Sequence, residues 1–219
     1  MNNSNKHGAD KILETLITEY KKLESCKLNI WNAFLLLRDC YGSGGKLLLC
    51  GNGGSAADSE HIVGELMKDF LLKRPLKEVE CNRIKTNFPD EWEYLSHGLQ
   101  RALPAISLVS HTSLISAYAN DIDFDMVFAQ QVYGYGKEGD ILLGISTSGN
   151  SKNVVNALKV AKAFGLKTIG LTGGKGGKMK EICDISIIAP ATETQKVQEY
   201  HLPIYHTLCA MLEVEFFRV

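Results

Sequence analysis

The stretch "KLLLCGNGGSAADSEHIVGEL", from Lys46 to Leu66, decides the fold because it holds a strand, a glycine turn and a helix in succession. "KLLLC" is a short apolar run, typical of a strand that is buried on both faces of a parallel sheet. "GNGG" predicts a tight turn, and the residues after it predict a helix over 55–70. Ser55 is the expected N-cap of that helix, with Asp58 three positions on in an approximate capping box.

The same alternation of strand and helix continues to the end of the chain. Further strands are predicted at residues 105–109, 140–145, 167–172 and 185–189. Helices are predicted at residues 113–119, 124–133, 152–164, 178–182 and 197–217. This alternation predicts an α/β fold, a three-layer αβα sandwich built on a mostly parallel sheet.

Two segments depart from the alternation. Residues 1–45 form an N-terminal helical segment, in which apolar residues recur at helical spacing over 10–40 as one long or broken helix. Residues 71–103 are charged, weakly periodic and bounded by prolines, which indicates an inserted and partly helical excursion. The length of 219 residues suits a single domain over 1–219.

Composition excludes several classes of protein. Lys and Arg total 24 against 25 Asp and Glu, so no global positive field favours nucleic acid or an anionic membrane. No apolar run reaches the roughly 20 residues that span a bilayer, and the polar N-terminus lacks a signal-peptide core. The six cysteines are scattered without a C-x-x-C pair, which favours reduced thiols and a cytoplasmic protein.

Two turns carry the pattern of an anion-binding site. Residues 51–55 follow the first strand, and residues 146–151, "STSGNS", follow the strand at 140–145. Ligands gather beyond the carboxyl ends of parallel strands, where helix N-termini offer free N–H groups. Hydroxyls and amides without Lys or Arg suit a phosphate monoester. One such turn alone is equally well explained as a loop with an N-cap, but two at equivalent strand ends favour a site.

Two nucleotide-binding motifs are rejected. Gly51, Gly53 and Ala56 satisfy G-x-G-x-x-[G/A], but the acidic residue at the required distance, Asp69, does not end a strand. This motif also leaves the serine cluster unexplained. "GGKGGKMK" is not a P-loop, because Met179 stands where Ser or Thr must bind magnesium.

Two pairs of polar side chains are candidates for chemistry. His61 and Glu65 are four residues apart and share a helix face. Gln198 and His206 are eight apart on the closing helix, with Pro203 between them as an expected kink. Such a pair is more often surface electrostatics or a buried hydrogen bond than a catalytic site. The four groups together could bind zinc, but Gln is an uncommon ligand and spacing alone supports a metal weakly.

Three motifs in order resemble a known family. "CGNGGSAADSEHIVGEL", "LLGISTSGNSKNVVNAL" and "VQEYHLPIYHTLC" resemble the bacterial phosphoheptose isomerases, which have the sugar-isomerase (SIS) fold. The resemblance runs from about Lys46 to the C-terminus, except for residues 71–103. It implies conversion of sedoheptulose 7-phosphate to glycero-manno-heptose 7-phosphate through an enediolate, for activated heptose and surface polysaccharides including lipopolysaccharide. It further implies one zinc ion per site and a homotetramer with active sites between subunits.

The resemblance also implies roles for particular residues. The implied substrate-binding residues are Asn52, Gly53, Gly54, Ser55, Glu65, Asn120, Asp121, Ser146, Thr147, Ser148, Ser151 and Gln198. The implied metal ligands are His61, Glu65, Gln198 and His206. Glu65 and His206 match the catalytic acid/base pair, which suits the transfer of a carbon-bound proton between neighbouring carbons. A zinc-bound Glu65 would be a weaker base, so the division of roles between the two stays open.

Two departures from the family leave alternatives open. The segment 71–103 is longer than the family's connection, and we hypothesise that it forms a lid or a subunit contact. Gln195 and Lys196 stand where the family more often has an Asp-Arg pair. The alternatives are an isomerase of another phosphosugar, or a non-catalytic SIS protein that binds phosphosugar or assists assembly in replication initiation. The joint presence of the four implied ligands favours an enzyme.

Overall fold

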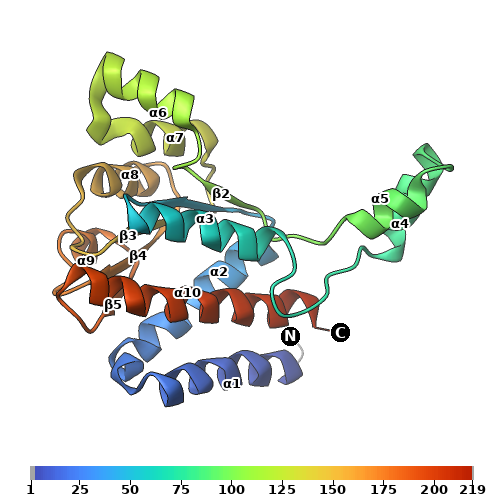
Figure 1. The fold of residues 1–219 in the computed structure, drawn as a ribbon, viewed down its shortest axis with the longest axis horizontal. Coiled ribbons are helices and arrows are strands. Elements are labelled where there is room, and N and C mark those ends of the chain that lie inside the picture. The colour runs from blue at the N-terminus through green and yellow to red at the C-terminus, as the bar shows by residue number, and fades with distance from the viewer. Residues whose placement is uncertain (1–2, 219) are drawn as a thin grey trace.

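A parallel β-sheet forms the centre of the protein, whose computed structural model describes residues 3–218 (Figure 1). Within these residues, five strands are arranged in the order β2-β1-β3-β4-β5, and all neighbours are parallel. The strands are β1 (Leu47–Cys50), β2 (Ala105–Ser107), β3 (Ile141–Ser146), β4 (Lys167–Gly173) and β5 (Ile185–Ala189). The predicted parallel sheet is confirmed.

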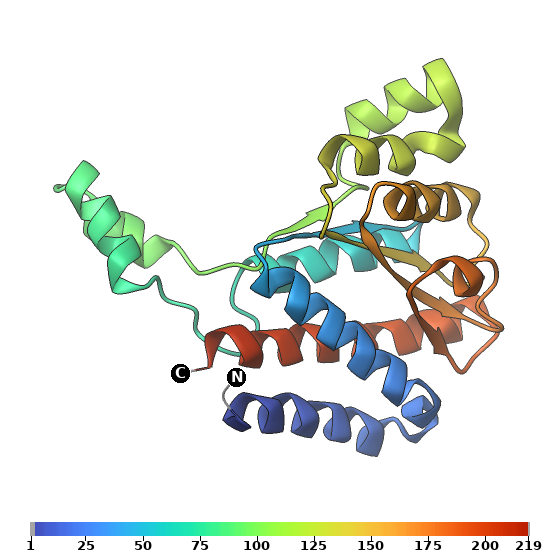
Figure 2. The same ribbon diagram turned by 180° about the vertical axis from the view of Figure 1, so that it is seen from behind.

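Helices cover both faces of this sheet (Figures 1 and 2). One face is covered by α2 (Lys27–Gly42), α3 (Gly54–Met67) and α10 (Thr194–Phe217), and α1 (Asn3–Glu19) packs outside them on α10. The other is covered by α6 (Thr112–Tyr118), α7 (Val127–Tyr135), α8 (Lys152–Ala163) and α9 (Met179–Ile182). Along β1, Leu47 and Leu49 join the first core, whereas Leu48 and Cys50 join the second. The predicted αβα sandwich is therefore confirmed.

Several predicted element boundaries need correction. Of the two forms predicted for the N-terminal helical segment, the broken one is observed, because a 3₁₀ turn, η1 (Lys21–Cys26), separates α1 from α2. A π-helical turn, η2 (Ala119–Asp123), and a 3₁₀ turn, η3 (Phe124–Met126), precede α7. The closing helix begins at Thr194 and continues through Pro203 as one helix to Phe217. Residues 1–2 and 219 of the predicted domain lie outside the described residues.

The predicted capping box at Ser55 is wrong. The helix α3 begins one residue earlier, and Gly53 is its N-cap with φ of 56°. Glycine adopts this left-handed conformation without steric cost, so the chain can turn before Ser55 is reached. Ser55 is therefore inside the first helical turn, and Asp58 has no capping partner there.

The middle of the 71–103 segment forms an arm that stands away from the body of the molecule (Figures 1 and 2), whereas Arg74 and Leu103 near its ends are buried in the body. Its helices are α4 (Glu78–Asn87) and α5 (Trp92–Gly98), which confirms the partly helical character that the sequence predicts. No residue of α4 is buried. Within residues 3–218, none of the helices has both the length and the apolar character that crossing a membrane requires.

Candidate functional site

The two glycine- and serine-rich turns lie next to each other. They follow β1 and β3, which pair in parallel with Cys50 opposite Gly144. Asn52 in the first turn and Asn153 at the start of α8 exchange two amide hydrogen bonds, each of 2.9 Å. This reciprocal pair ties the turns together. Asn153 was not predicted as a site residue from the sequence. The one signal that could have found it is a polar residue just after the serine cluster and beside the apolar "VV".

A cavity of about 350 Å³ opens between these turns and the start of α10. It is lined by Asn52, Gly53, Gly54, Ser55, Ile145, Ser146, Thr147, Ser151, Thr194 and Gln198. Its volume is in the range of small-ligand pockets, and none of these described lining residues carries a charged side chain. Eight of the predicted substrate-binding residues therefore meet here, and Thr194 is an addition that the sequence did not reveal.

The hydroxyls of the second turn are close enough to share one ligand. Ser146 Oγ lies 2.9 Å from Ser151 Oγ and 3.5 Å from Ser148 Oγ. Ser148 itself is exposed at the rim, where its Oγ accepts a hydrogen bond from the Asn150 N–H at 3.2 Å. The helices α3 and α8 both begin at this cavity, where the N-cap of α3 is Gly53 and the side chain of Ser151, the N-cap of α8, makes no capping bond. Hydroxyls and two positive helix ends together suit an anion such as phosphate.

Helices α3 and α10 run side by side in the same direction away from the cavity. A Cβ at Gly54 would lie 2.3 Å from Gln198 Nε2, so a larger residue at this position would displace the end of the Gln198 side chain. Seven residues further along each helix, His61 Nδ1 lies 2.9 Å from Tyr205 OH. At 1.5 Å per residue, His206 is about 12 Å along the helix from Gln198.

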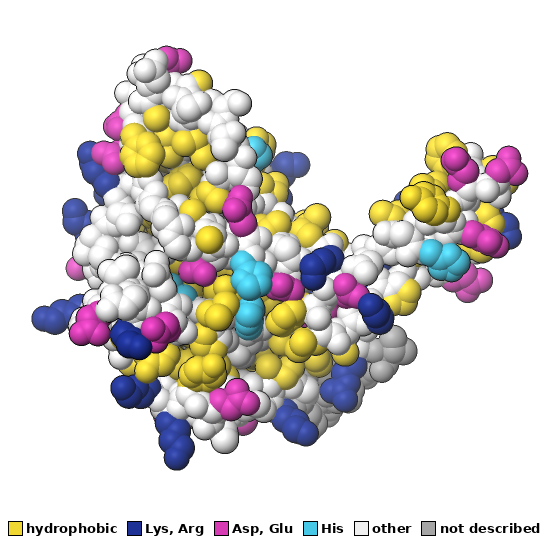
Figure 3. Space-filling model, in the orientation of Figure 1, with side chains coloured by type: hydrophobic (Ala, Val, Ile, Leu, Met, Phe, Trp, Pro, Cys, Tyr) yellow, Lys and Arg dark blue, Asp and Glu magenta, His cyan; other side chains and the backbone are white. Residues whose placement is uncertain are grey.

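A cluster of His61, Glu65 and His206 occupies this second position. His61 Nε2 lies 3.1 Å from Glu65 Oε1, and the rings of His61 and His206 are 5.0 Å apart and nearly perpendicular. Figure 3 shows histidine side chains at the centre of the face that α3 and α10 form. The helix spacing of His61 and Glu65 thus predicts their contact, and the closing helix adds His206 to it.

Tyr205 and Asp58 support this cluster, although the sequence did not single out Tyr205. Burial raises the pKa of Tyr205, and so do the charge of Asp58 and its hydrogen bond. Burial also raises the pKa of Asp58, against the hydrogen bond of Tyr205 and the charge of His61. Tyr205 therefore stays a neutral phenol that contacts His61 Nδ1 and sets which way the ring faces.

His206 Nε2 is buried without a hydrogen-bond partner among the described residues, and Glu65 Oε2, also without a hydrogen bond, lies 3.7 Å from Lys68 Nζ. Burial lowers the pKa of His206, as does the charge of His61, whereas Glu65 opposes the shift. His206 is accordingly a neutral imidazole near pH 7, with an unshared nitrogen. An imidazole nitrogen and a carboxylate oxygen are donor types that zinc prefers.

The donors are not arranged as a complete metal site in this chain. Among residues 3–218, no group of three or more His, Cys, Asp or Glu side chains is placed to hold a metal ion together. His61 Nε2 contacts Glu65, and Gln198 lines the cavity instead. Three of the four implied ligands are thus brought together, and the fourth is not.

Asn120 and Asp121 are the predicted substrate-binding residues that the fold keeps away from the cavity. Both are exposed in η2, where Asn120 Nδ2 donates to Asp121 Oδ1 at 3.0 Å. Neither residue lines the cavity.

Known proteins share this chain's sequence and fold. Residues 98–173 match the SIS domain family. A phosphoheptose isomerase of a Nitratiruptor species is 39% identical over 210 residues, which are 96% of this chain and 98% of that protein. The chain belongs to the phosphoheptose isomerase family. This confirms the resemblance in the three motifs.

Other phosphoheptose isomerases agree with this assignment. The one from Aliarcobacter butzleri is 42% identical over 195 residues, 89% of each chain. The solved phosphoheptose isomerase from Neisseria gonorrhoeae has a TM-score of 0.69 and 32% identity, over 94% of this chain and 91% of that one. The αβα sandwich is therefore that of the phosphoheptose isomerases.

Proposed function

We propose that this protein is an aldose–ketose isomerase that converts sedoheptulose 7-phosphate to glycero-manno-heptose 7-phosphate. The observation that carries the proposal is the layout of α3 and α10. The uncharged cavity lies where both helices begin, and the cluster of Glu65, His61 and His206 lies about 12 Å along them. A chain of seven carbons with a terminal phosphate can extend from one to the other. Its product would supply activated heptose for surface polysaccharide such as lipopolysaccharide.

The phosphate is bound at the helix N-termini. Ser146 and Ser151 offer hydroxyl donors, and the amides that open α3 and α8 add a positive dipole end. Because the described lining has no charged side chain, the phosphate dianion is bound by these neutral donors. Asn52 and Gln198, at the cavity wall, are placed to bind hydroxyls of the sugar.

The chemical step is two proton transfers at carbon and one between the two oxygens. A base removes a proton from C1 of the ketose, which forms a C1–C2 enediolate, and a proton is returned at C2; the hydroxyl proton moves from O1 to O2. Glu65 and neutral His206 share these transfers, as a carboxylate and an imidazole do in general acid–base catalysis. The lowered pKa of His206 keeps its Nε2 able to accept a proton.

Zinc is part of the proposal. His61, Glu65 and His206 would hold it, with Gln198 as the fourth ligand implied by the resemblance. When bound, zinc supplies a Lewis acid that stabilises the charge on the enediolate oxygens. Removal of metal by a chelator should lower both turnover and the thermal unfolding temperature, and zinc should restore both. A chelated protein with unchanged turnover and stability would argue against the metal.

We further propose a cytoplasmic homotetramer with active sites between subunits. All six cysteines are free thiols, which suits a reducing compartment. Asn120 and Asp121, implied as substrate contacts, lie outside their own chain's cavity, which suits a site that another copy completes.

Deuterium exchange tests the activity. The zinc-loaded protein is incubated in D₂O with sedoheptulose 7-phosphate or, in a parallel sample, fructose 6-phosphate. Exchange at C1 and formation of the aldose only with the seven-carbon substrate would support the proposal. Exchange only with fructose 6-phosphate would favour an isomerase of another phosphosugar. No exchange with either by a folded, zinc-loaded protein would favour a non-catalytic SIS protein.

A further inference from the structure

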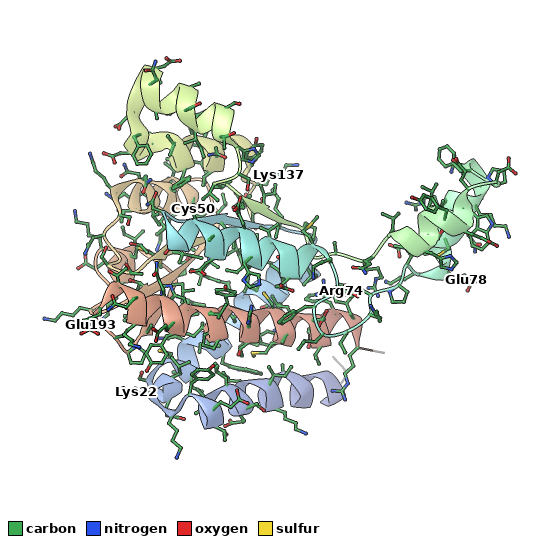
Figure 4. All side chains as sticks on the ribbon, viewed as in Figure 1. Lys22, Cys50, Arg74, Glu78, Lys137 and Glu193 are labelled. Carbon is green, nitrogen blue, oxygen red and sulfur yellow. The ribbon has the colours of Figure 1, made fainter. Side chains whose placement is uncertain are left out.

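A buried ion pair lies at the C-terminal end of α3, where the arm leaves the body. Arg74 Nε lies 2.7 Å from Glu213 Oε1, and both side chains are fully buried. Figure 4 labels Arg74 beside the ends of α3 and α10. Neither residue touches the hydroxyl-lined cavity. A buried pair of this kind is costly to desolvate, so it is retained only where its charges are well partnered.

The remaining donors of Arg74 bind the end of α3. Its Nη1 donates to the carbonyl of Leu66 at 2.8 Å, and its Nη2 donates to the carbonyl of Glu65 at 2.9 Å. The last carbonyls of a helix have no partner inside the helix, and a cation there is favourable to the helix dipole. Arg74 thus holds the backbone of the residue whose side chain reaches His61.

Glu213 holds the chain that follows the helix. Its carboxylate accepts hydrogen bonds from the backbone N–H groups of Phe70, Leu71 and Leu72, at 2.9, 2.7 and 3.0 Å. Together with Arg74, these bonds lock the last turn of α3 to α10, which carries both Glu213 and His206. A fully satisfied buried network of this kind is rigid.

Both ends of the arm meet at the same point. The Arg101 N–H donates to the Arg74 carbonyl at 2.8 Å, and the Leu103 N–H donates to the Leu66 carbonyl at 3.0 Å. The stem of the arm is therefore built on the last turn of the helix that carries Glu65.

We propose that Arg74 is a positioning residue for the isomerase reaction. By holding the Glu65 carbonyl and pairing with Glu213, it sets where the Glu65 carboxylate stands relative to His206. This inference rests on the proposed function, since it assigns Glu65 to the proton transfers. Arg74 contacts no substrate group. A displacement of about 1 Å at a reacting group is enough to lower turnover by about 100-fold, so a loosened last turn has a measurable cost.

The test compares Arg74→Lys with a core variant of equal stability. Lysine keeps the charge but loses the planar fork that reaches Glu213 and two carbonyls at once. Ile30→Val or Ile30→Ala, in the buried part of α2, is chosen as the control whose unfolding temperature matches that of Arg74→Lys. The values of kcat and KM for sedoheptulose 7-phosphate are measured for both variants and for the wild-type protein.

We expect Arg74→Lys to lose kcat by about tenfold or more, with KM within about twofold, because the phosphate cavity lies at the other end of α3. The Ile30 variant should keep its kcat. Equal kcat in the two variants would overturn the positioning role. Inactive wild-type protein would instead overturn the proposed function.

Glu213→Gln covers the case in which Arg74→Lys does not fold. It keeps the shape of the side chain and one acceptor oxygen, but places an amide NH₂ against backbone N–H groups. A loss of kcat of about fivefold or more at unchanged KM would support the inference, and an unchanged kcat would overturn it.

Discussion

At the scale of single residues, the proposed chemistry depends on Glu65 and His206. We expect Glu65→Gln and His206→Ala each to lower turnover by about 100-fold or more, as the loss of a general acid or base does. His97→Ala, at an exposed position in α5, is the matched control and should keep full turnover. Steady-state kinetics on folded variants measure the effect. Turnover near that of the wild-type protein in both site variants would remove these residues from the mechanism.

Ser148 should contribute to affinity rather than to rate. It is exposed at the rim of the cavity with its Oγ 3.5 Å from Ser146 Oγ, so Ser148→Ala removes a phosphate donor without opening the core. We expect KM to rise by about tenfold or more at similar kcat, the size of one hydrogen bond to a charged group. Ser43→Ala, in the turn after α2, is the control and should leave KM unchanged. An unaltered KM for Ser148→Ala would contradict its role.

Sequence patterns predicted some site residues, but they did not predict the residues that hold those side chains or their backbone in position. A four-residue spacing predicts that His61 and Glu65 touch, because helix geometry is local. Tyr205, Asn153 and Arg74 act through partners more than 100 residues away, or through the backbone of a neighbouring segment. No local period encodes such contacts, since they depend on how the elements pack.

At the scale of secondary-structure elements, apolar runs predicted the strands well, and helix starts were predicted less well. The strands β1 and β3 are buried on both faces, so their sequences are continuous apolar runs. The start of α3 was misplaced because a left-handed glycine, not a serine side chain, turns the chain there. The start of α10 was missed because its first residues are polar and exposed.

A buried histidine makes the stability of α10 depend on pH. His201 is fully buried, and its Nε2 donates to the Thr172 carbonyl at 3.2 Å, so the ring is neutral. Burial lowers the pKa of His201 to about 4, against a hydrogen bond that raises it. In the unfolded chain the pKa of His201 is near 6.5, so on acidification the unfolded chain binds a proton before the folded protein does. The contribution of neutral His201 to the free energy of unfolding is therefore fully present above pH 6.5. It falls by about 3 kcal/mol on acidification to pH 4.

His201→Gln isolates this contribution, because glutamine can donate to the same carbonyl but does not titrate. Urea unfolding is measured for both proteins between pH 7 and pH 4, so that other titrating groups cancel in the difference. We expect the free energy of unfolding of the variant to fall less steeply with acid. Parallel curves for the two proteins would show that His201 does not carry the effect.

At the scale of the whole molecule, the layers of the fold were predictable, but the position of the arm was not. The alternation of strands and helices implies a parallel sheet covered on both faces. The order β2-β1-β3-β4-β5 and the outward projection of residues 71–103 follow from packing between distant segments. The arm also lacks a core of its own, and Tyr94 in α5 is 83% exposed.

Deletion of the arm tests its role as a lid or a subunit contact. A short Gly-Ser linker replaces residues 76–100, so that Arg74 and Arg101 at the stem are kept. Since no residue of α4 is buried, we expect the far-UV circular dichroism of the remaining fold to be retained. Sedimentation equilibrium should show a smaller assembly, or steady-state kinetics a lower turnover. A shortened protein with unchanged assembly and unchanged turnover would rule out both roles.

The most direct test of the whole account is a crystal structure of the Glu65→Gln variant with sedoheptulose 7-phosphate bound. We predict that the phosphate contacts the hydroxyls of Ser146 and Ser151, while C1 and C2 of the sugar lie beside the substituted side chain and the His206 ring. A sugar bound with its phosphate elsewhere, or with its carbonyl carbon remote from the reactive groups of both helices, would contradict the central claim.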